Sequence, residues 1–315
     1  MKPKPACLYL FFLSAFALQA QTVQPQIARE KTDAVLQRKL QELTRSFKGE
    51  AGIYVRHLKT GQTAVINADT VFPTASMVKV PILIGLLHKM ERGELDYHKQ
   101  LTYRDSLLYT GESDLVGLFR DSVQVSLSKM MMLMITTSDN TASLWCQGLA
   151  GGGTDINNWL ETNGFPHTRV NSRTPGREAS RKTYGWGQTT PREMAGLLVR
   201  IREGKAVSAA ASDRMYRNLT HIYWDGEALS EIPPHVQVAS KQGAVDRSRS
   251  EVVLVNAPSG DYVFCVITKN QQDISYEYDN AGFVLLRDVS RLLWQHFEPK
   301  SPWKPAKGAE KFYAE

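Results

Sequence analysis

Apolar and polar residues alternate in different ways along the first third of the chain. Between residues 30 and 48, apolar side chains fall near the helical repeat among charged ones, which predicts an amphipathic helix packed on a sheet. Residues 52–58 and 63–66 are β-rich, and the break Lys59-Thr60-Gly61-Gln62 between them predicts a hairpin turn. The nearly continuous apolar run over 76–87 predicts a helix buried on most sides.

The middle third is helical in character. Helical spacing over 125–137, 141–149 and 155–163 predicts three helices. Residues 166–188 lose this periodicity and contain several Pro and Gly, so we expect a long, functional loop there. Thr190-Pro191 then combines an N-cap hydroxyl with proline at the first helical position, which predicts a helix over 191–202.

The last third returns to strands, at 236–241, 252–255 and 262–268, followed by a helix over 280–297. Strands at both ends around a helical middle predict an α+β fold: one antiparallel sheet built from both termini and flanked by helices, with an inserted all-helical lobe. We expect a single domain over 21–315. Its α/β lobe would comprise about 30–75 and 205–300, and its helical lobe about 76–204, with the active site at the seam between the lobes.

The first twenty residues differ from the rest. Lys2 and Lys4 precede an apolar run over 6–18 that is followed by small residues, which is typical of a secretory signal peptide over 1–20. We therefore expect a secreted or periplasmic protein with no stable membrane insertion after cleavage. An uncleaved anchor remains the alternative, although the run is short for a membrane-spanning helix.

Charge and cysteine content exclude several functions. The net charge of +6 is small, and Lys and Arg are scattered among acids, so we expect no nucleic-acid partner. Cys146 and Cys265 remain after the signal; both lie in apolar stretches, where buried free thiols are commoner than a bridge, although a disulfide stays open. Neither has a metal-binding spacing with His, so we predict no metal or other cofactor. Nothing demands a partner chain, and we expect a monomer.

The first chemical motif is Ser76-x-x-Lys79, at the start of the buried helix. This spacing places both side chains on one helix face. A serine hydroxyl is a weak nucleophile until a base takes its proton, and a lysine in a desolvated, cation-rich pocket can serve as that base. A surface pair is the alternative for this common pattern, but an apolar run is a costly place for a lysine without a role.

Two further motifs stand far along the chain: Ser138-Asp139-Asn140 between two helices, and Lys241-Gln242-Gly243 at the end of a strand. Separately they could be an N-cap and a strand with a turn. Together with Ser76-x-x-Lys79 they resemble the signature of class A β-lactamases and penicillin-binding proteins. The resemblance covers about 51–297, and the segments 72–79, 135–142 and 189–195 follow the family order.

The resemblance implies roles for four catalytic residues. Ser76 is acylated by a cyclic or peptide amide, and Lys79 belongs to the proton network. Ser138 relays a proton to the leaving nitrogen. Lys241 polarises Ser138 and attracts the substrate carboxylate.

It also implies binding residues. The backbone N–H groups of Ser76 and Ala244 form the oxyanion hole, and Asn140, with Gln242 and Gly243, contacts the substrate. Arg249, with Arg247 as second choice, supplies another carboxylate anchor. Tyr109 walls the entrance or is simply an exposed aromatic.

Two residues depart from the family pattern. Gln242 replaces a Thr or Ser hydroxyl that normally touches the substrate carboxylate, and its amide is longer but can still donate. Thr174 stands where the family has a Glu that activates the deacylating water. Glu178, four positions later, is the nearest carboxylate. It could activate the water, or it could simply be a solvent-exposed charge on the loop.

These observations leave three functions. The first is a β-lactamase that hydrolyses a β-lactam through an acyl-enzyme on Ser76, with Glu178 or Lys79 serving deacylation. The second is a D,D-peptidase, or a related amidase or esterase, acting on D-Ala-D-Ala-like cell-wall peptides and deacylating β-lactams slowly. The third is a penicillin-binding protein without turnover. We rank the β-lactamase first because the resemblance is to the compact class A enzymes.

Overall fold

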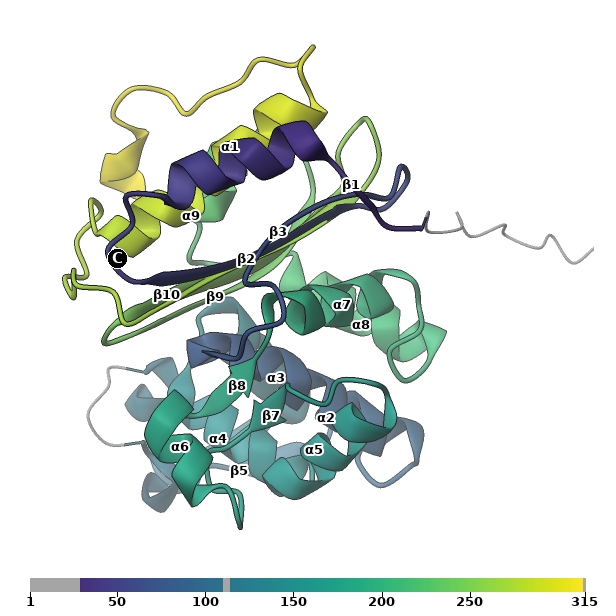
Figure 1. Cartoon of the computed structure of the whole chain (residues 1–315). Helices are drawn as coiled ribbons and strands as arrows, with labels where there is room; N and C mark the ends of the chain where they lie inside the picture. Colours follow the sequence, from purple (N-terminus) through teal and green to yellow (C-terminus); the bar gives the residue numbers. More distant parts are fainter. Residues whose placement is uncertain (1–28, 110–113, 314–315) are drawn as a thin grey trace, which may run out of the picture.

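A six-stranded sheet lies between two layers of helices (Figure 1). The structure, a computed structural model, describes residues 29–109 and 114–313; the expected signal peptide lies outside them. Strand order is β1-β3-β2-β11-β10-β9, so strands from both ends of the chain form one sheet, as predicted. All neighbouring strands are antiparallel except β1 and β3. The strands are β1 Lys31–Thr32, β2 Glu50–His57, β3 Gln62–Ile66, β9 Val238–Val245, β10 Ser248–Val255 and β11 Tyr262–Lys269.

The terminal helices α1 Ala34–Thr44 and α9 Ala281–Phe297 cover one face of the sheet, as predicted. The Asp33 side chain caps α1 by accepting from the N–H groups of Val35 and Leu36. Apolar side chains of α1, α9 and the sheet form one buried cluster, and a second cluster joins the other face to the remaining helices. The sheet therefore separates two hydrophobic cores, and the packing on both of its faces holds the edge strand β9 in position.

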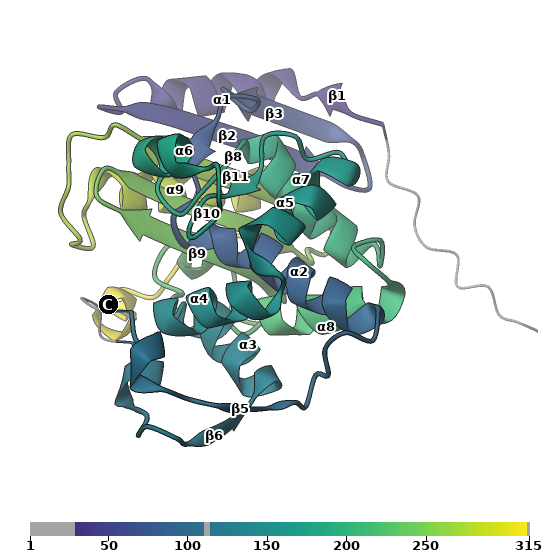
Figure 2. The same cartoon turned by 90° about the horizontal axis from the view of Figure 1, so that it is seen from below.

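The remaining helices gather on the far side of the sheet (Figure 2). They are α2 Lys79–Glu91, α3 Leu127–Thr136, α4 Asn140–Leu149, α5 Gly152–Thr162, α6 Glu178–Tyr184, α7 Pro191–Arg202 and α8 Ala209–Leu219. Short strands join them: β4 Phe72–Pro73, β5 Gln100–Thr102, β6 Gln124–Ser126, β7 Arg169–Val170 and β8 Gly187–Thr189. The 3-10 helices are η1 Ala75–Val78, η2 Asp105–Leu107, η3 Leu115–Leu118, η4 Ala228–Glu231 and η5 Ala309–Phe312.

Helix α2 runs through the core of this layer. All residues from Lys79 to Leu87 are buried, in agreement with the continuous apolar run. Pro81 stands in the first turn, where its missing N–H costs no helical hydrogen bond. Gly85 brings α5 close, because a Cβ there would lie 2.7 Å from Cγ1 of Ile156. The packing holds the start of α2, and with it Lys79, in one place.

The structure corrects three expectations. Strand β9 continues past Lys241 to Val245 and turns into β10 at 246–247, without a Gly or Pro to mark the turn. The 166–188 loop contains β7, α6 and β8. Helix α8 was not predicted, because its buried face consists of small or isolated residues and gives a weak apolar pattern; Ser208 caps it.

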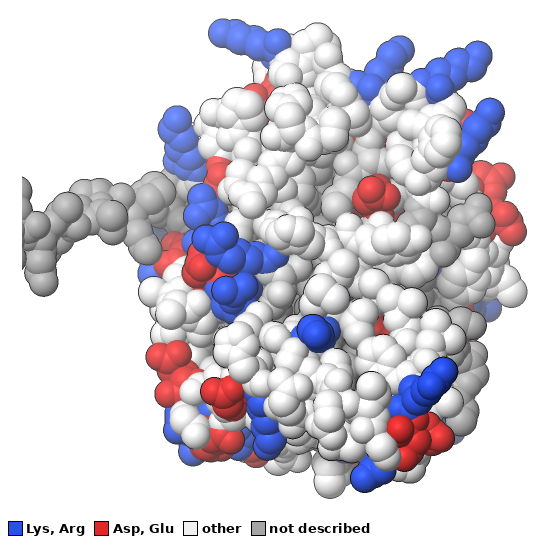
Figure 3. All heavy atoms as spheres, turned by 180° about the vertical axis from the view of Figure 1, so that it is seen from behind, with Lys and Arg blue, Asp and Glu red and all other residues white. Residues whose placement is uncertain are grey.

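Charged side chains are dispersed over the surface. On the face seen in Figure 3, Lys and Arg are spread around the rim and interspersed with acids. This distribution agrees with the modest net charge of the chain.

Glu251 is an exception to the rule that charged groups stay at the surface. It is fully buried on β10, where its carboxyl accepts from Ser240 Oγ at 2.7 Å and from the N–H of Ala228 at 2.9 Å. Burial, reinforced by the charge of nearby Glu227, raises the pKa of Glu251 to about 8. The fold therefore favours the neutral acid beside the strand that carries Lys241.

The variant Glu251→Gln is expected to gain stability relative to the parent as pH rises. Below pH 4.5 the acid is protonated in both states and contributes no difference. Above that value the Glu251 carboxyl ionises readily only in the unfolded chain. The free energy of unfolding of the parent therefore falls by up to about 1.4 kcal/mol per pH unit until the pH reaches the pKa of Glu251 in the folded protein. The amide can keep both contacts by accepting from Ala228 and donating to Ser240. Urea unfolding of both proteins at pH 5 and pH 8 measures the effect. If the free energies of unfolding of variant and parent differed by the same amount at both pH values, the prediction would be contradicted.

Candidate active site

Ser76 lies in η1, immediately before α2 and at the edge of a large cleft. The preceding Ala75 has φ 45°, a left-handed conformation that costs a non-glycine residue about 1–3 kcal/mol. This conformation belongs to the sharp entry into η1. Ser76 remains partly accessible while its neighbours Ala75 and Met77 are buried, so its hydroxyl can meet a ligand from the cleft.

Lys79 is fully buried one turn later, and its ammonium group contacts Ser76, Ser138 and Asn140. Its Nζ lies 3.0 Å from Ser76 Oγ and 3.0 Å from Ser138 Oγ. It also donates to Asn140 Oδ1 at 2.8 Å and to the Ser138 carbonyl. A lysine so placed can exchange protons with either serine.

The second motif occupies the bend between α3 and α4. Ser138 has φ 62°, a second left-handed residue at the site. Asp139 caps α4 by accepting from the Ala142 N–H at 2.7 Å, so the motif also provides the N-cap. Asp114, which no motif indicates, accepts from the N–H groups of Asn140 and Thr141 at 2.9 and 2.7 Å. Its role could not be predicted because it is distant in sequence from the segment that it holds.

Lys241 reaches the same hydroxyl from the opposite side. Its Nζ lies 3.1 Å from Ser138 Oγ and 2.6 Å from Gln242 Oε1. Complete burial lowers the pKa of Lys241 well below its usual value, and the positive charge of Lys79 acts in the same direction. The Ser138 hydroxyl is therefore held between two lysines, one of which releases its proton more easily than a solvated lysine.

Gly243 allows the edge strand to approach the nucleophile. A Cβ on Gly243 would lie 2.7 Å from the Ser76 N and 2.9 Å from the Ala75 Cβ, so any side chain here would push η1 away from β9. Because β9 is an edge strand, half of its backbone groups are not used by the sheet. Ala244 follows on the same strand and lines the cleft with Ser76.

The cleft has a volume of about 1760 Å³. The sequence-predicted residues that line it are Ser76, Tyr109, Ser138, Asn140, Gln242, Gly243 and Ala244. Tyr109 and Trp186 form one wall, with their rings in an edge-to-face contact at 5.1 Å. The two lysines lie behind this surface and touch it through Ser138.

Arg249 is placed elsewhere. It is fully buried against α9, its guanidinium donating to the carbonyls of Val245, Asp246 and Ser248. The rings of Tyr276 and Phe283 also lie within 4.9 Å of the guanidinium carbon. The expected carboxylate anchor does not fit this position, because its Nη atoms donate to backbone carbonyls, its buried Nε has no partner among the described residues, and it does not line the cleft.

Arg247, the second choice, is exposed and lines the cleft near the β9–β10 turn. Its Nε donates to the Gln271 carbonyl at 3.0 Å. The rest of its guanidinium can therefore face a ligand.

The loop over 166–188 brings neither Thr174 nor Glu178 to the cleft. Thr174 is buried; its hydroxyl donates to the Ser172 carbonyl at 2.9 Å and packs against Gly153, where an added Cβ would lie 1.8 Å from it. Glu178 is exposed at the start of α6 and accepts from the Gly176 N–H at 3.1 Å. Neither residue lines the cleft that holds Ser76, so the solvated alternative fits Glu178.

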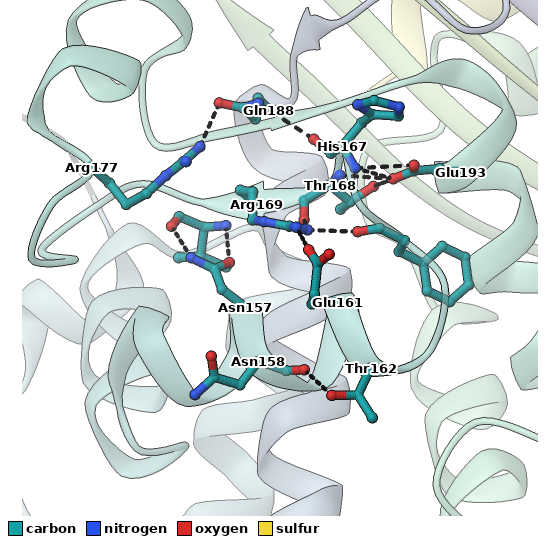
Figure 4. Close-up of polar contacts among 12 residues, drawn as sticks. Asn157, Asn158, Glu161, Thr162, His167, Thr168, Arg169, Arg177, Gln188 and Glu193 are labelled. Atoms are coloured by element: carbon teal, nitrogen blue, oxygen red, sulfur yellow. Dashed lines mark hydrogen bonds and ion pairs between the residues drawn. The ribbon is translucent and has the colours of Figure 1, made fainter.

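Polar contacts fix the base of this loop to α7 and α5 (Figure 4). The Glu193 carboxylate accepts from the N–H groups of His167 and Thr168 and from the Thr168 hydroxyl. On the other side, the Asn157 side chain bonds both backbone groups of Val170. These contacts hold the start of the loop, and the N–H groups of Asn171 and Ser172 donate to the Trp186 carbonyl, which ties Trp186 to that start.

The two cysteines of the described region do not line the cleft. Cys146 and Cys265 are buried free thiols, and burial raises the pKa of each. Among residues 29–109 and 114–313, no cluster of three or more His, Cys, Asp or Glu side chains could bind a metal ion. Around Ser76, the hydroxyl and amine groups stand within the reach that nucleophilic catalysis requires of a nucleophile and its base.

Curated relatives resemble the chain over most of its length. The β-lactamase VEB-1 of Pseudomonas aeruginosa is 20% identical over 270 residues, covering 82% of this chain and 89% of the relative. A β-lactamase of Streptomyces fradiae is 24% identical over 284 residues, covering 89% and 92%.

Solved structures share the fold. PBP-A superposes with a TM-score of 0.76 at 26% identity, covering 87% of this chain and 99% of PBP-A. A β-lactamase from Sphaerobacter thermophilus gives 0.73 at 21% identity, covering 85% and 98%. The profile of the β-lactamase enzyme family matches residues 35–297. With this match and the three motifs gathered around one cleft, the chain belongs to the β-lactamase enzyme family.

Proposed function

We propose that this protein hydrolyses β-lactams through an acyl-enzyme on Ser76. The observation that carries the proposal is the contact network in which Lys79 reaches both Ser76 and Ser138, and Lys241 reaches Ser138. Membership of the β-lactamase enzyme family supports it. A mutant of PBP-A has been solved as an acyl-enzyme complex with penicillin G, at 26% identity to this chain.

Acylation begins when Lys79, in its neutral form, accepts the Ser76 proton and the alkoxide attacks the lactam carbonyl. The backbone N–H groups of Ser76 and Ala244 stabilise the oxyanion of the tetrahedral intermediate. Its collapse breaks the lactam C–N bond, and Ser138 donates a proton to the leaving nitrogen. Lys79 or Lys241, each about 3 Å from the Ser138 oxygen, restores that proton.

Substrate binding uses charge and the amide of Gln242. Lys241 draws the substrate carboxylate toward β9, and Gln242 Nε2 can donate to it where a shorter hydroxyl is usual. Arg247 adds a positive charge at the cleft rim. Asn140 holds the substrate amide on the side of Lys79. The longer Gln242 side chain narrows the space for the carboxylate and thereby affects specificity.

Deacylation is assigned to Lys79. Thr174 has no ionisable group, and Glu178 lies outside the cleft. Lys79 accepts a proton from water as the hydroxide attacks the ester; the Ser76 oxygen then leaves and is reprotonated. Because one base serves both steps, the acyl-enzyme should persist longer than in an enzyme with a separate base for water. Slow turnover also keeps a D-Ala-D-Ala-like cell-wall peptide as the second candidate substrate.

We also propose that the protein is exported and acts as a monomer in the periplasm or outside the cell. Lys2 and Lys4 before the apolar run support a cleaved signal over 1–20. In the described portion of the chain, no helix is long and apolar enough to cross a bilayer. The N-terminal sequence of the secreted protein tests the cleavage.

The variant Ser76→Ala is expected to lose all covalent labelling by a β-lactam, because the acyl group has no oxygen to bond. Hydrolysis should fall by at least about 10³-fold. Intact-mass spectrometry after incubation with penicillin G measures the adduct. The matched variant Ser128→Ala, in α3, should label like the parent. An adduct retained in Ser76→Ala would place the nucleophile elsewhere.

The variant Glu178→Gln is expected to deacylate at the parent rate, because this carboxylate lies outside the cleft. The protein is acylated, freed of excess penicillin by gel filtration, and followed by mass as the adduct disappears. A rate more than about tenfold lower would correspond to over 1.4 kcal/mol of transition-state stabilisation. Such a loss would give Glu178 the role in activating water that we assign to Lys79.

A further inference from the structure

The cleft extends past Lys241 to a wall built partly from residues outside the family match. The family profile ends at residue 297, yet Glu310 and Tyr313 line the same cleft as Ser76. The segment after α9 runs back along that helix to reach this place (Figure 1). Near its start it is fixed by Trp294, whose Nε1 donates to the Ser301 carbonyl at 2.9 Å.

Tyr313 packs closely at the end of this segment. A Cβ built on Gly226 would lie 2.9 Å from the Tyr313 Cβ, so the absence of a side chain at 226 makes room for the tyrosine. The Tyr313 ring also stacks on Tyr278, with centroids 6.2 Å apart and an interplanar angle of 28°. The neighbouring Phe312 is 88% exposed and takes no part in this packing.

Arg287 fixes the other half of the wall. It is buried on α9, with its guanidinium carbon 3.7 Å from the centre of the Tyr278 ring. It donates to the carbonyl of Tyr278 and, at 3.5 Å, to that of Gly226. Tyr278, Arg287, Gly226 and Tyr313 therefore form one connected group, which we call the tyrosine wall.

The tyrosine wall lies on the Lys241 side of the cleft. Ala228, two residues after Gly226, donates its N–H to Glu251, and the same carboxyl accepts from Ser240, the neighbour of Lys241 on β9. In the proposed reaction Ser138 protonates the leaving nitrogen and Lys241 attracts the carboxylate attached to that half of the substrate. The wall thus borders the leaving-group side, whereas Tyr109 and Trp186 belong to the opposite wall.

We propose that Tyr313 and Tyr278 form a subsite for a planar aromatic substituent on the leaving-group side of the acyl donor. The inference rests on the proposed function. Two tyrosine rings can offer their faces to a planar group, and Tyr278 is 48% exposed at this wall. Tyr313 lies beyond residue 297, where the family profile ends, so this preference would not follow from the matched part of the chain alone.

Two cephalosporins with the same acylamino side chain test the subsite, one with an arylvinyl group at C3 and the other with methyl. The second-order rate constant for acylation of the full chain is measured for each by intact mass. The aryl-to-methyl ratio should fall about three- to tenfold in Tyr313→Ala, the range expected for one lost aromatic contact. Gly226→Ala should lower it similarly, because its new Cβ displaces Tyr313. The control Phe312→Ala should keep the parent ratio.

The outcomes separate the two proposals. An unchanged ratio in Tyr313→Ala overturns the subsite while leaving the acylation of Ser76 intact. An equal fall in Phe312→Ala also overturns it, since the effect would then come from general loosening of the segment. If neither cephalosporin acylates the parent protein, the proposed function fails, and the subsite fails with it.

Discussion

The Ser138 hydroxyl between two buried lysines is the interaction on which the rest of the site depends. Lys79 and Lys241 approach its oxygen to 3.0 and 3.1 Å. Two ammonium groups so close in a desolvated site repel each other, so one of them releases a proton more readily than in water. Burial and the charge of Lys79 thus lower the pKa of Lys241, and the arrangement requires a framework that prevents the two lysines from separating.

That framework consists of one helix start and one edge strand pressed together. Lys79 cannot withdraw because α2 is buried along its first nine residues. Lys241 cannot withdraw because β9 is paired along its length with β10. Gly243 lets these elements meet, and the left-handed residues Ala75 and Ser138 turn the chain sharply at the two contact points. The strain at these residues is offset by the packing around them.

The loop over 166–188 shows that the acylation machinery and the fate of the acyl group are determined separately. Glu193 and Asn157 hold the start of the loop in place. Inside it, Thr174 fills a tight space beside Gly153, so a longer side chain would require Gly153 and its helix to move. The protein therefore keeps the parts that form the ester while the water-activating carboxylate of the family pattern is missing from the loop.

The sequence by itself determined the elements and the chemical class. The spacing of apolar residues located the first and last helices and the strands of the sheet. An element that buries one face must carry apolar residues at its own structural period, and this period is visible in the sequence. The three motifs indicated the nucleophile and its partners, because their residue types have few other uses in that order. Helix α8 escaped prediction because its buried face carries only two large apolar residues, Met215 and Leu219.

Only the tertiary structure decided which side chains enter the cleft. Arg249 and Arg247 are two positions apart on one hairpin, yet one is buried against α9 and the other lines the cleft. Their fate depends on where the turn falls and how the strands twist, and a small shift of register moves side chains to the other face. The contributions of Asp114 and Tyr313 depend likewise on contacts between distant segments, which leave no periodic signal in the chain.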